Sequence, residues 1–304
     1  MLRQVILAAS RSGTTRRIVQ HAPVTRSVVH RFVSGARTED AVSASKALIA
    51  SGRTVTIDHL GEDTVEAGQA ESTTKAYLSL LQLLTDAGLT ADGKAEVSVK
   101  LSALGQAFDQ ELALAHATRI CEAARDAGTT VTLDMEDHTT TDSTLEVLRE
   151  LRKDFPTTGA VLQSYLRRTE ADCEDLKASR VRLCKGAYKE PASVAFQSRS
   201  EVDRSYVRCL KVLMAGDGYP MVASHDPRMI AIAADLASSR AKGTYEYQML
   251  FGIRPAEQER LAAQGETVRV YVPYGDEWYG YFMRRLAERP ANVAFFLRAM
   301  ATKR

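Results

Sequence analysis

The feature of this sequence that most constrains its fold is an alternation of two patterns, repeated eight times. Short runs rich in β-branched and aromatic residues are each followed by a longer segment with helical periodicity. The runs are 54–60, 96–102, 130–136, 159–165, 181–188, 219–225, 244–250 and 267–274. Strands separated by helices form parallel sheets, and eight such units in about 250 residues match the size of a (β/α)8 barrel. We therefore predict an α/β fold of the TIM barrel type.

The segments between these runs carry signals for helix starts. We predict helices over 109–126, 143–153, 200–214, 227–240 and 255–264. Ser143 and Glu146 have the spacing of a capping box, and Asp226 is placed to cap the helix that follows it. Pro227 and Pro255 stand at or near helix starts, where proline is favoured.

The domain organisation follows from where the repeats begin. Residues 1–50 precede them and have the pattern of two or three helices, so we predict an N-terminal helical segment over 1–50 packed on a catalytic barrel over 51–304. A doubly wound sheet is the alternative architecture. It usually carries a GxGxxG turn for a dinucleotide, and this sequence has none.

Composition excludes several function classes. The net charge of +2 does not demand a nucleic acid partner. The four cysteines form no CxxC, so no zinc ribbon or thioredoxin motif is present, and free thiols in a reducing cytosol are the preferred interpretation. No apolar run approaches the roughly 18 residues of a membrane span. These features predict a cytoplasmic protein.

The first 38 residues are basic, with seven arginines and no acidic residue. This segment could be a transit peptide or a surface for anionic lipid, which would place the protein at the inner face of the membrane. It lacks a secretory apolar core, so we prefer an ordinary basic helical segment.

Polar and aromatic residues follow most of the predicted strands. In a barrel these strand ends build the active site. The residues are Lys100, Asp134, Met135, Glu136, Asp137, His138, Gln163, Ser164, Tyr165, Arg182, Lys185, Tyr188, Ser224, His225, Asp226, Gln248, Leu250, Tyr271 and Tyr274. Lys100 lies within the apolar run VSVKL, where an unpaired charge would be costly. Asp137 and His138 could instead be surface loop residues, and Gly186 an ordinary turn glycine.

The segment after the last strand (271–290) contains the most informative pair, Arg284 and Arg285. Asp276 can cap a helix that runs to about Glu288. Adjacent helical side chains point about 100° apart, but long arginines can still converge on one ligand. The planar fork of arginine matches a carboxylate, so the pair could hold a small amino acid. A solvated surface pair is the alternative, which the neighbouring aromatic residues disfavour.

Ordered motifs across nearly the whole barrel make a family resemblance specific. They are VSVKLSALG (97–105), LDMEDH (133–138), VLQSYLRRT (161–169), VRLCKGAYKEP (181–191), SHDP (224–227), YQMLFGIRP (247–255) and YVPYG…YFMRRLAERP (271–290). The chain resembles the bacterial monofunctional proline dehydrogenases, which are distorted (β/α)8 barrels with FAD and N-terminal helices. Two departures are Ser224, where many relatives have threonine, and Cys184, where an aliphatic residue is common.

The resemblance implies roles for individual residues. Arg284 and Arg285 look like the pair that binds the proline carboxylate, and Lys100 and Asp134 look like members of the same substrate network. Arg182 resembles the arginine near flavin N5. The residues that resemble walls of the substrate site are Tyr188, Leu250, Tyr271 and Tyr281. The residues that match FAD contacts are Met135, Gln163, Lys185, Gly186, Ala187, Ser224, His225, Gln248 and Glu288.

The resemblance also implies a reaction. L-proline would lose hydride from Cδ to flavin N5 and give Δ1-pyrroline-5-carboxylate, which water opens to glutamate semialdehyde. A membrane quinone would accept the electrons, and a separate pyrroline-5-carboxylate (glutamate semialdehyde) dehydrogenase would take the product. No metal is implied.

The residues alone leave other functions open. A metal-dependent barrel enzyme could use Asp134, Glu136, Asp137, His138 and His225 as ligands. A Schiff-base aldolase could use Lys100 or Lys185 as its nucleophile. A third possibility is a non-catalytic amino-acid sensor on the same barrel.

Overall fold

A closed barrel of eight parallel strands forms the centre of the molecule, as the computed structural model shows for residues 29–62 and 64–288. The strands are β1 (Thr54–His59), β2 (Ala95–Val99), β3 (Val131–Leu133), β4 (Gly159–Gln163), β5 (Arg180–Cys184), β6 (Tyr219–Ala223), β7 (Glu246–Leu250) and β8 (Val268–Tyr274). Pairing of β1 with β8, from Thr54 opposite Arg269 to His59 opposite Tyr274, closes the ring. The predicted (β/α)8 fold is confirmed.

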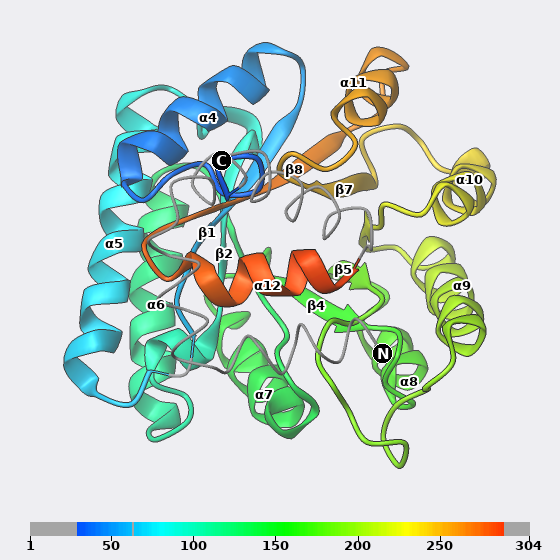
Figure 1. Ribbon diagram of the computed structural model, residues 1–304, viewed down its shortest axis with the longest axis horizontal. Coiled ribbons are helices and arrows are strands. Elements are labelled where there is room, and N and C mark those ends of the chain that lie inside the picture. The colour runs from blue at the N-terminus through cyan, green and yellow to red at the C-terminus, as the bar shows by residue number, and fades with distance from the viewer. Residues whose placement is uncertain (1–28, 63, 289–304) are drawn as a thin grey trace, which may run out of the picture.

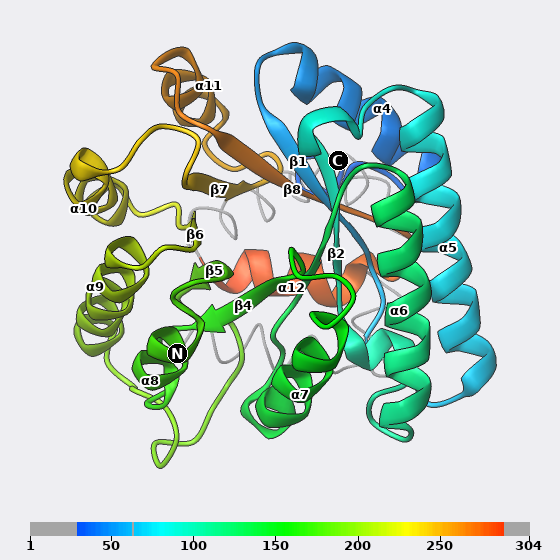
Figure 2. The same cartoon turned by 180° about the vertical axis from the view of Figure 1, so that it is seen from behind.

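Helices surround the barrel (Figures 1 and 2). Those that follow the first seven strands are α5 (Ala67–Asp86), α6 (Gln110–Asp126), α7 (Thr141–Leu151), α8 (Thr169–Leu176), α9 (Arg199–Ala215), α10 (Pro227–Leu236) and α11 (Pro255–Ala263). The five predicted helices are present, with ends within two residues of the prediction except at the end of α10, where a 3-10 turn over Ala237–Ser239 continues the chain. Helices α5 and α8 were not predicted.

The helix caps are partly as expected. Asp226 caps α10, since its side chain accepts a hydrogen bond from the Arg228 amide at 3.1 Å. The capping box proposed at Ser143 is wrong. Helix α7 begins at Thr141, and the Ser143 hydroxyl, inside the first turn, donates back to the Thr140 carbonyl at 3.1 Å. A 3-10 turn over His138–Thr140 leads into this helix and moves its start two residues earlier.

The last helix, α12 (Trp278–Glu288), distorts the barrel. It follows β8 but crosses the end of the barrel where the strands finish, in red in Figure 1. Helix α4 (Thr38–Ala50), which precedes β1, packs on β8, β1 and α5 and so occupies the outer position that α12 leaves. Phe32 packs against Phe282 of α12, with ring centroids 6.4 Å apart.

The predicted division at residue 50 stays a prediction. The chain from Val29 to α4 contacts the barrel, as when the Ser34 amide donates to the Pro273 carbonyl at 3.0 Å. Most of the basic stretch predicted over the first 38 residues lies outside the described residues, which begin at Val29. Within the part of the chain that the structure describes, no helix is both long enough and apolar enough to cross a bilayer.

The strands place apolar and polar side chains on opposite faces. Val55 and Ile57 of β1 are buried in an apolar cluster with residues of α5, whereas Thr56 and Asp58 are buried and belong to a polar set. Successive strand residues point to opposite faces, so one face packs on the helices and the other fills the barrel. The interior is therefore unusually polar for a parallel barrel, whose strands are usually apolar on both faces.

The polar interior has two layers. Near the strand starts, Arg269 pairs with Glu246 at 2.9 Å and Arg180 with Glu96 at 2.7 Å. The second layer, toward the strand ends, is built around Asp134 and Arg182. Buried charges are tolerated when they are paired and hydrogen-bonded, and both layers meet that condition.

Candidate active site

Five side chains meet inside the barrel near the strand ends, and we call them the interior cluster: Asp58, Lys100, Asp134, Arg182 and Tyr271. Arg182 of β5 donates to Asp134 at 2.6 Å. The Tyr271 hydroxyl of β8 donates to the other oxygen of Asp134 at 2.7 Å. The Arg182 guanidinium also lies 5.3 Å from the centre of the Tyr271 ring. The Asp134 carboxylate thus joins Arg182 to Tyr271, a residue 137 positions from Asp134 in the sequence.

Lys100 lies directly after β2, one residue beyond the strand that was expected to contain it. Its ammonium group is 2.6 Å from Asp58, 3.8 Å from Asp134 and 3.4 Å from the Tyr271 hydroxyl. Only 8% of the side chain is exposed, so these contacts replace its hydration. Lys100 therefore belongs to the buried network and is not a surface lysine.

Two acids keep Lys100 charged. Burial opposes its charged form, but Asp58 and Asp134 outweigh burial, and the pKa of Lys100 is raised. Burial raises the pKa of Asp58, and the charge of Lys100 opposes this rise. A lysine that acts as a nucleophile must be neutral, so this environment argues against the Schiff-base aldolase at Lys100.

Glu136 lies beside this cluster. Burial raises its pKa to about 7, although Ser102 opposes the rise by donating from its hydroxyl at 2.6 Å and its amide at 3.1 Å. The Gln163 side chain donates to the Glu136 carbonyl at 2.5 Å. The loop after β3 is thereby tied to both neighbouring strand ends.

The two arginines of α12 contact different residues. Arg284 forms two hydrogen bonds with the Glu62 carboxylate, one of them 3.0 Å long, and its guanidinium lies 5.9 Å from the centre of the Tyr188 ring. Arg285 lies over its own-helix neighbour Tyr281 at 5.0 Å, and its side chain is buried. The solvated surface pair is therefore excluded, and Arg284 holds a carboxylate of this chain in its fork.

Arg285 also lies near the end of β5. Burial raises the pKa of Cys184 to about 12, and the positive charges of Arg182 and Arg285 oppose this rise. Arg284 lies over Tyr188 of the loop after β5, and Arg285 acts on Cys184 at the end of that strand. Glu288 is the last residue of α12, and its side chain lies outside the described ones.

The residues that resemble flavin contacts, apart from Glu288 of α12, gather at the ends of five neighbouring strands, β3 to β7. Gln248 accepts from Arg182 at 2.6 Å, and the His225 ring accepts from the Leu250 amide at 2.9 Å. Lys185 pairs with Asp203 and, at 3.0 Å, with Asp226. The others are Met135 and Ser224, which are buried, and Gly186 and Ala187, which are half-buried.

Two acidic residues of this region were missed in the sequence. Asp58 could have been found, because its run TVTIDHL (54–60) has polar residues at alternate positions on the interior face. Glu62 lies in the loop after β1, 222 residues before Arg284, and no local pattern links the two.

The residues considered as metal ligands are separated by the structure. Asp134 is held by Arg182, His138 by Glu190, and His225 by the Leu250 amide. Within residues 29–62 and 64–288, no group of three or more histidine, cysteine and acidic side chains could hold a metal ion. The described part of the chain thus offers the metal-dependent alternative no group of ligands.

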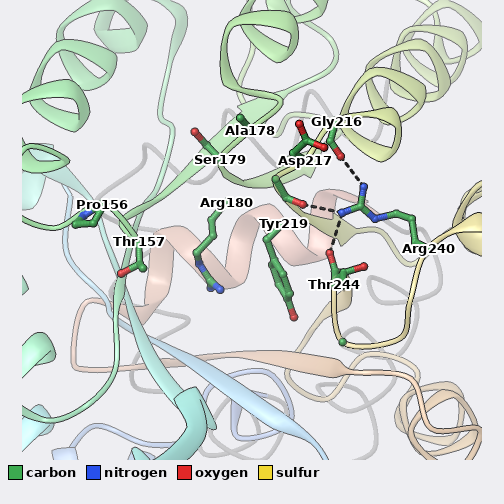
Figure 3. A pocket seen from close by; sticks show the side chains of 12 residues that line it. Pro156, Thr157, Ala178, Ser179, Arg180, Gly216, Asp217, Tyr219, Arg240 and Thr244 are labelled. Atoms are coloured by element: carbon green, nitrogen blue, oxygen red, sulfur yellow. Dashed lines mark hydrogen bonds between the residues drawn. The ribbon is translucent and has the colours of Figure 1, made fainter.

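A hollow of about 660 Å³ lies at the opposite end of the barrel, beside the starts of β5 and β6 (Figure 3). Arg240 borders it and donates to the carbonyls of Gly216 and Gly218 at 2.8 and 2.7 Å. These bonds tie the loops before β6 and β7 together, which is a structural task. The residues of the hollow lie away from the interior cluster.

The chain is similar to known proteins over most of its length. A model of the proline dehydrogenase family matches residues 41–298. The chain is 39% identical over 308 residues to Proline dehydrogenase 1 of Bacillus subtilis, with both sequences covered completely. It is 40% identical over 283 residues to Proline dehydrogenase of Deinococcus radiodurans, with 90% of each covered.

A solved structure gives the same fold. Proline utilization A (PutA) from Bdellovibrio bacteriovorus, inactivated by N-propargylglycine, matches with a TM-score of 0.81 and 25% identity. The match covers 94% of this chain and 36% of that longer one, so this chain spans about a third of PutA. Together with the family model and the full-length relatives, this likeness leads to one conclusion: the chain belongs to the proline dehydrogenase family and is an enzyme of that family.

Proposed function

We propose that this enzyme oxidises L-proline to Δ1-pyrroline-5-carboxylate with FAD as the hydride acceptor. The observation that carries the proposal is the placement of Arg284 and Arg285 on a helix that crosses the barrel end above the interior cluster. A pair of arginines suits a small ligand with a carboxylate. Membership of the family supports proline as that ligand.

The substrate residues come from α12, β2, β5, β7 and β8. Arg284 and Arg285 bind the carboxylate, and the half-buried Tyr188, Leu250 and Tyr271 contact the ring. The Tyr281 ring packs against the Arg285 guanidinium and helps to fix its position. Holding one small rigid molecule at both ends can supply several kcal/mol of a reaction barrier.

Lys100 and Asp134 act through their neighbours. Asp134 fixes the orientation of the Tyr271 hydroxyl and of Arg182, since it accepts from both. Lys100 balances the negative charge of Asp58 and Asp134. A site held in place by such supporting hydrogen bonds keeps its geometry when the ligand arrives.

The residues present fit FAD. When bound, the flavin would accept the hydride and act as the electron sink of the reaction. Arg182 is the residue proposed to lie near it. Its Nε and Nη1 are used by Gln248, Asp134 and Ser98, whereas Nη2 has only a 3.4 Å contact with Thr56. Nη2 therefore has donor capacity for a polar atom of the cofactor.

The remaining proposed contacts border the same region. Gly186 has a φ of +106°, and the Tyr165 ring occupies the space that a side chain at this position would need. Because glycine has no side chain, a ligand can approach the backbone closely here. Lys185 has three donors, of which Asp203 and Asp226 use two. The other proposed contacts are Met135, Gln163, Ala187, Ser224, His225, Gln248 and Glu288.

Charge placement suggests how the protein promotes the reaction. A positive group at Arg182 favours the electron-rich reduced cofactor. The proline amine must lose its proton before hydride leaves, because an ammonium group has no electron pair to donate. The charged Lys100 disfavours the ammonium form of a nearby substrate.

We further propose that the electrons pass to a membrane quinone and that a separate pyrroline-5-carboxylate dehydrogenase takes the product. Such an acceptor would place this cytoplasmic enzyme at the inner face of the membrane. The PutA relatives are named as bifunctional proteins, and this chain matches 24% of the length of the one from Escherichia coli.

Product trapping tests the reaction. Purified protein is incubated with L-proline and an artificial electron acceptor, and o-aminobenzaldehyde is added to capture the cyclic imine. The expected result is a coloured adduct that forms only with both components present. Proline binding without product would favour the amino-acid sensor, and a product that requires added metal would favour the metal enzyme.

A further inference from the structure

The loop after β5, residues 185–198, carries several of the proposed site residues without a helix of its own. It follows Cys184 and ends where α9 begins at Arg199, and it contains Gly186, Ala187 and Tyr188. A loop of this length would be free to move unless something holds it. Lys185 ties its start to Asp226 after β6, and Glu190 joins its middle to the loops after β3 and β4.

The Glu190 carboxylate is buried and accepts hydrogen bonds from residues of two other loops. One carboxylate oxygen accepts from the His138 amide at 3.0 Å and from the Tyr165 hydroxyl at 3.2 Å. The other oxygen contacts Nδ1 of His138. Only 2% of the Glu190 side chain is exposed. This contact is a hydrogen bond to a carboxylate oxygen in the tautomer of His138 that has its hydrogen on Nδ1.

Tyr165 connects this carboxylate to the backbone near the cofactor residues. Its ring packs directly on Gly186, where an added Cβ would lie 2.3 Å from a ring atom. Its amide donates to the Lys185 carbonyl at 3.0 Å, and its carbonyl accepts from Phe196 at 2.8 Å. The loop therefore wraps around Tyr165, and Glu190 holds the hydroxyl end of the same ring.

From these contacts we propose that Glu190 is a positioning residue for substrate binding. It fixes the loop after β5 against the loops after β3 and β4, and so holds Tyr188 beneath Arg284. The proposal deepens the proposed function and rests on it. Glu190 lies two residues from Tyr188, whose ring is 5.9 Å from the Arg284 guanidinium. A shift of the loop would separate this aromatic ring from the arginine that binds the carboxylate.

The mechanism predicts which kinetic parameter changes. Without the Glu190 carboxylate, the His138 amide and the Tyr165 hydroxyl lose their acceptor, and the loop loses its fixed position. Proline must then order the loop when it binds, which weakens binding more than it slows the chemical step. The interior cluster shares no hydrogen bond with Glu190, so the hydride transfer geometry around Arg182 is retained.

The test compares Glu190→Ala, Glu190→Gln and Tyr165→Phe as full-length, flavin-loaded enzymes. The matched control is Tyr245→Phe, which also removes a phenol bond to a carboxylate, here 2.7 Å to Glu266 at the other end of the barrel. The measurements are KM and kcat for proline, and the affinity for cyclopentanecarboxylate from the change in the flavin spectrum. Melting temperatures monitor folding.

For Glu190→Ala we expect KM for proline and Kd for cyclopentanecarboxylate to rise at least about tenfold, while kcat changes by less than about threefold. Glu190→Gln should recover most of this loss, since its amide can accept from the His138 amide and donate to the His138 ring. Tyr165→Phe should show a smaller rise, and Tyr245→Phe none.

Three results would overturn the proposal: an unchanged KM in Glu190→Ala, equal losses in Glu190→Ala and Glu190→Gln, or a rise in the control as large as in Tyr165→Phe. If Glu190→Ala does not fold, the Gln and Phe variants decide alone. Failure of the proposed function is distinguishable, because the wild-type enzyme would then not oxidise proline at all.

Discussion

Removal of Arg284 gives the strongest test of the carboxylate clamp. In Arg284→Met the methionine keeps an apolar stem on α12 but removes the fork that now holds Glu62. A charge-assisted hydrogen bond contributes about 1.5–3 kcal/mol. Two bonds to a proline carboxylate would exceed this range, but the arginine must first give up the Glu62 carboxylate. The net loss is therefore about 1.5–3 kcal/mol, or roughly 10- to 100-fold in kcat/KM.

Steady-state kinetics with L-proline measures this loss. The matched control is Arg208→Met, which breaks an exposed arginine–glutamate pair of similar length, 2.8 Å to Glu170, on the outside of the barrel. The control should keep its kcat/KM, because exposed pairs contribute little. If Arg284→Met and Arg285→Met both retain wild-type kcat/KM for proline, the clamp is refuted.

Three further predictions concern buried charges. Arg182→Met should lower the flavin midpoint potential by roughly 30–60 mV, since about 1.4 kcal/mol corresponds to about 30 mV for two electrons; an unchanged potential in a redox titration would count against the role of Arg182. Burial raises the pKa of Glu136 from 4.5 to about 7, so its contribution to stability is present below pH 4.5 and is lost as pH rises through 7. Urea unfolding should show Glu136→Gln gaining on the wild type by up to roughly 3 kcal/mol between pH 5 and 8, and an equal difference at both pH values would contradict this. Because Asp58 keeps Lys100 charged, borohydride with a carbonyl substrate should label no lysine at this site, and a trapped adduct would revive the aldolase.

The strands were predictable because their signal is local. All eight runs contain the observed strands almost completely, since β-branched and apolar residues were clustered between helical segments. The ends were less accurate. Lys100 was placed inside β2, whereas the strand stops at Val99 and a 3-10 turn begins at Leu101. Helix α5 was missed although it is the 20-residue helix beside β1, because its threonines and serines weaken the helical pattern.

The site was predictable only in part. Polar residues at strand ends are visible in the sequence, and the barrel brings Lys100, Asp134, Arg182 and Tyr271 together. Their partners were not visible. Glu62 and Glu190 are loop residues that pair with groups 222 and 52 positions away. Only the closed barrel and the crossing of α12 bring those loops together, and no local pattern encodes either.

Anaerobic mixing of the flavin-loaded enzyme with L-proline tests the central claim most directly. We predict that absorbance near 450 nm bleaches with about one equivalent of L-proline bound. D-proline should leave the flavin oxidised, because its ring cannot place Cδ–H at the flavin while its carboxylate is held. Cyclopentanecarboxylate should also leave it oxidised, because it has no amine to donate an electron pair. Persistent flavin absorbance at saturating L-proline would contradict the account.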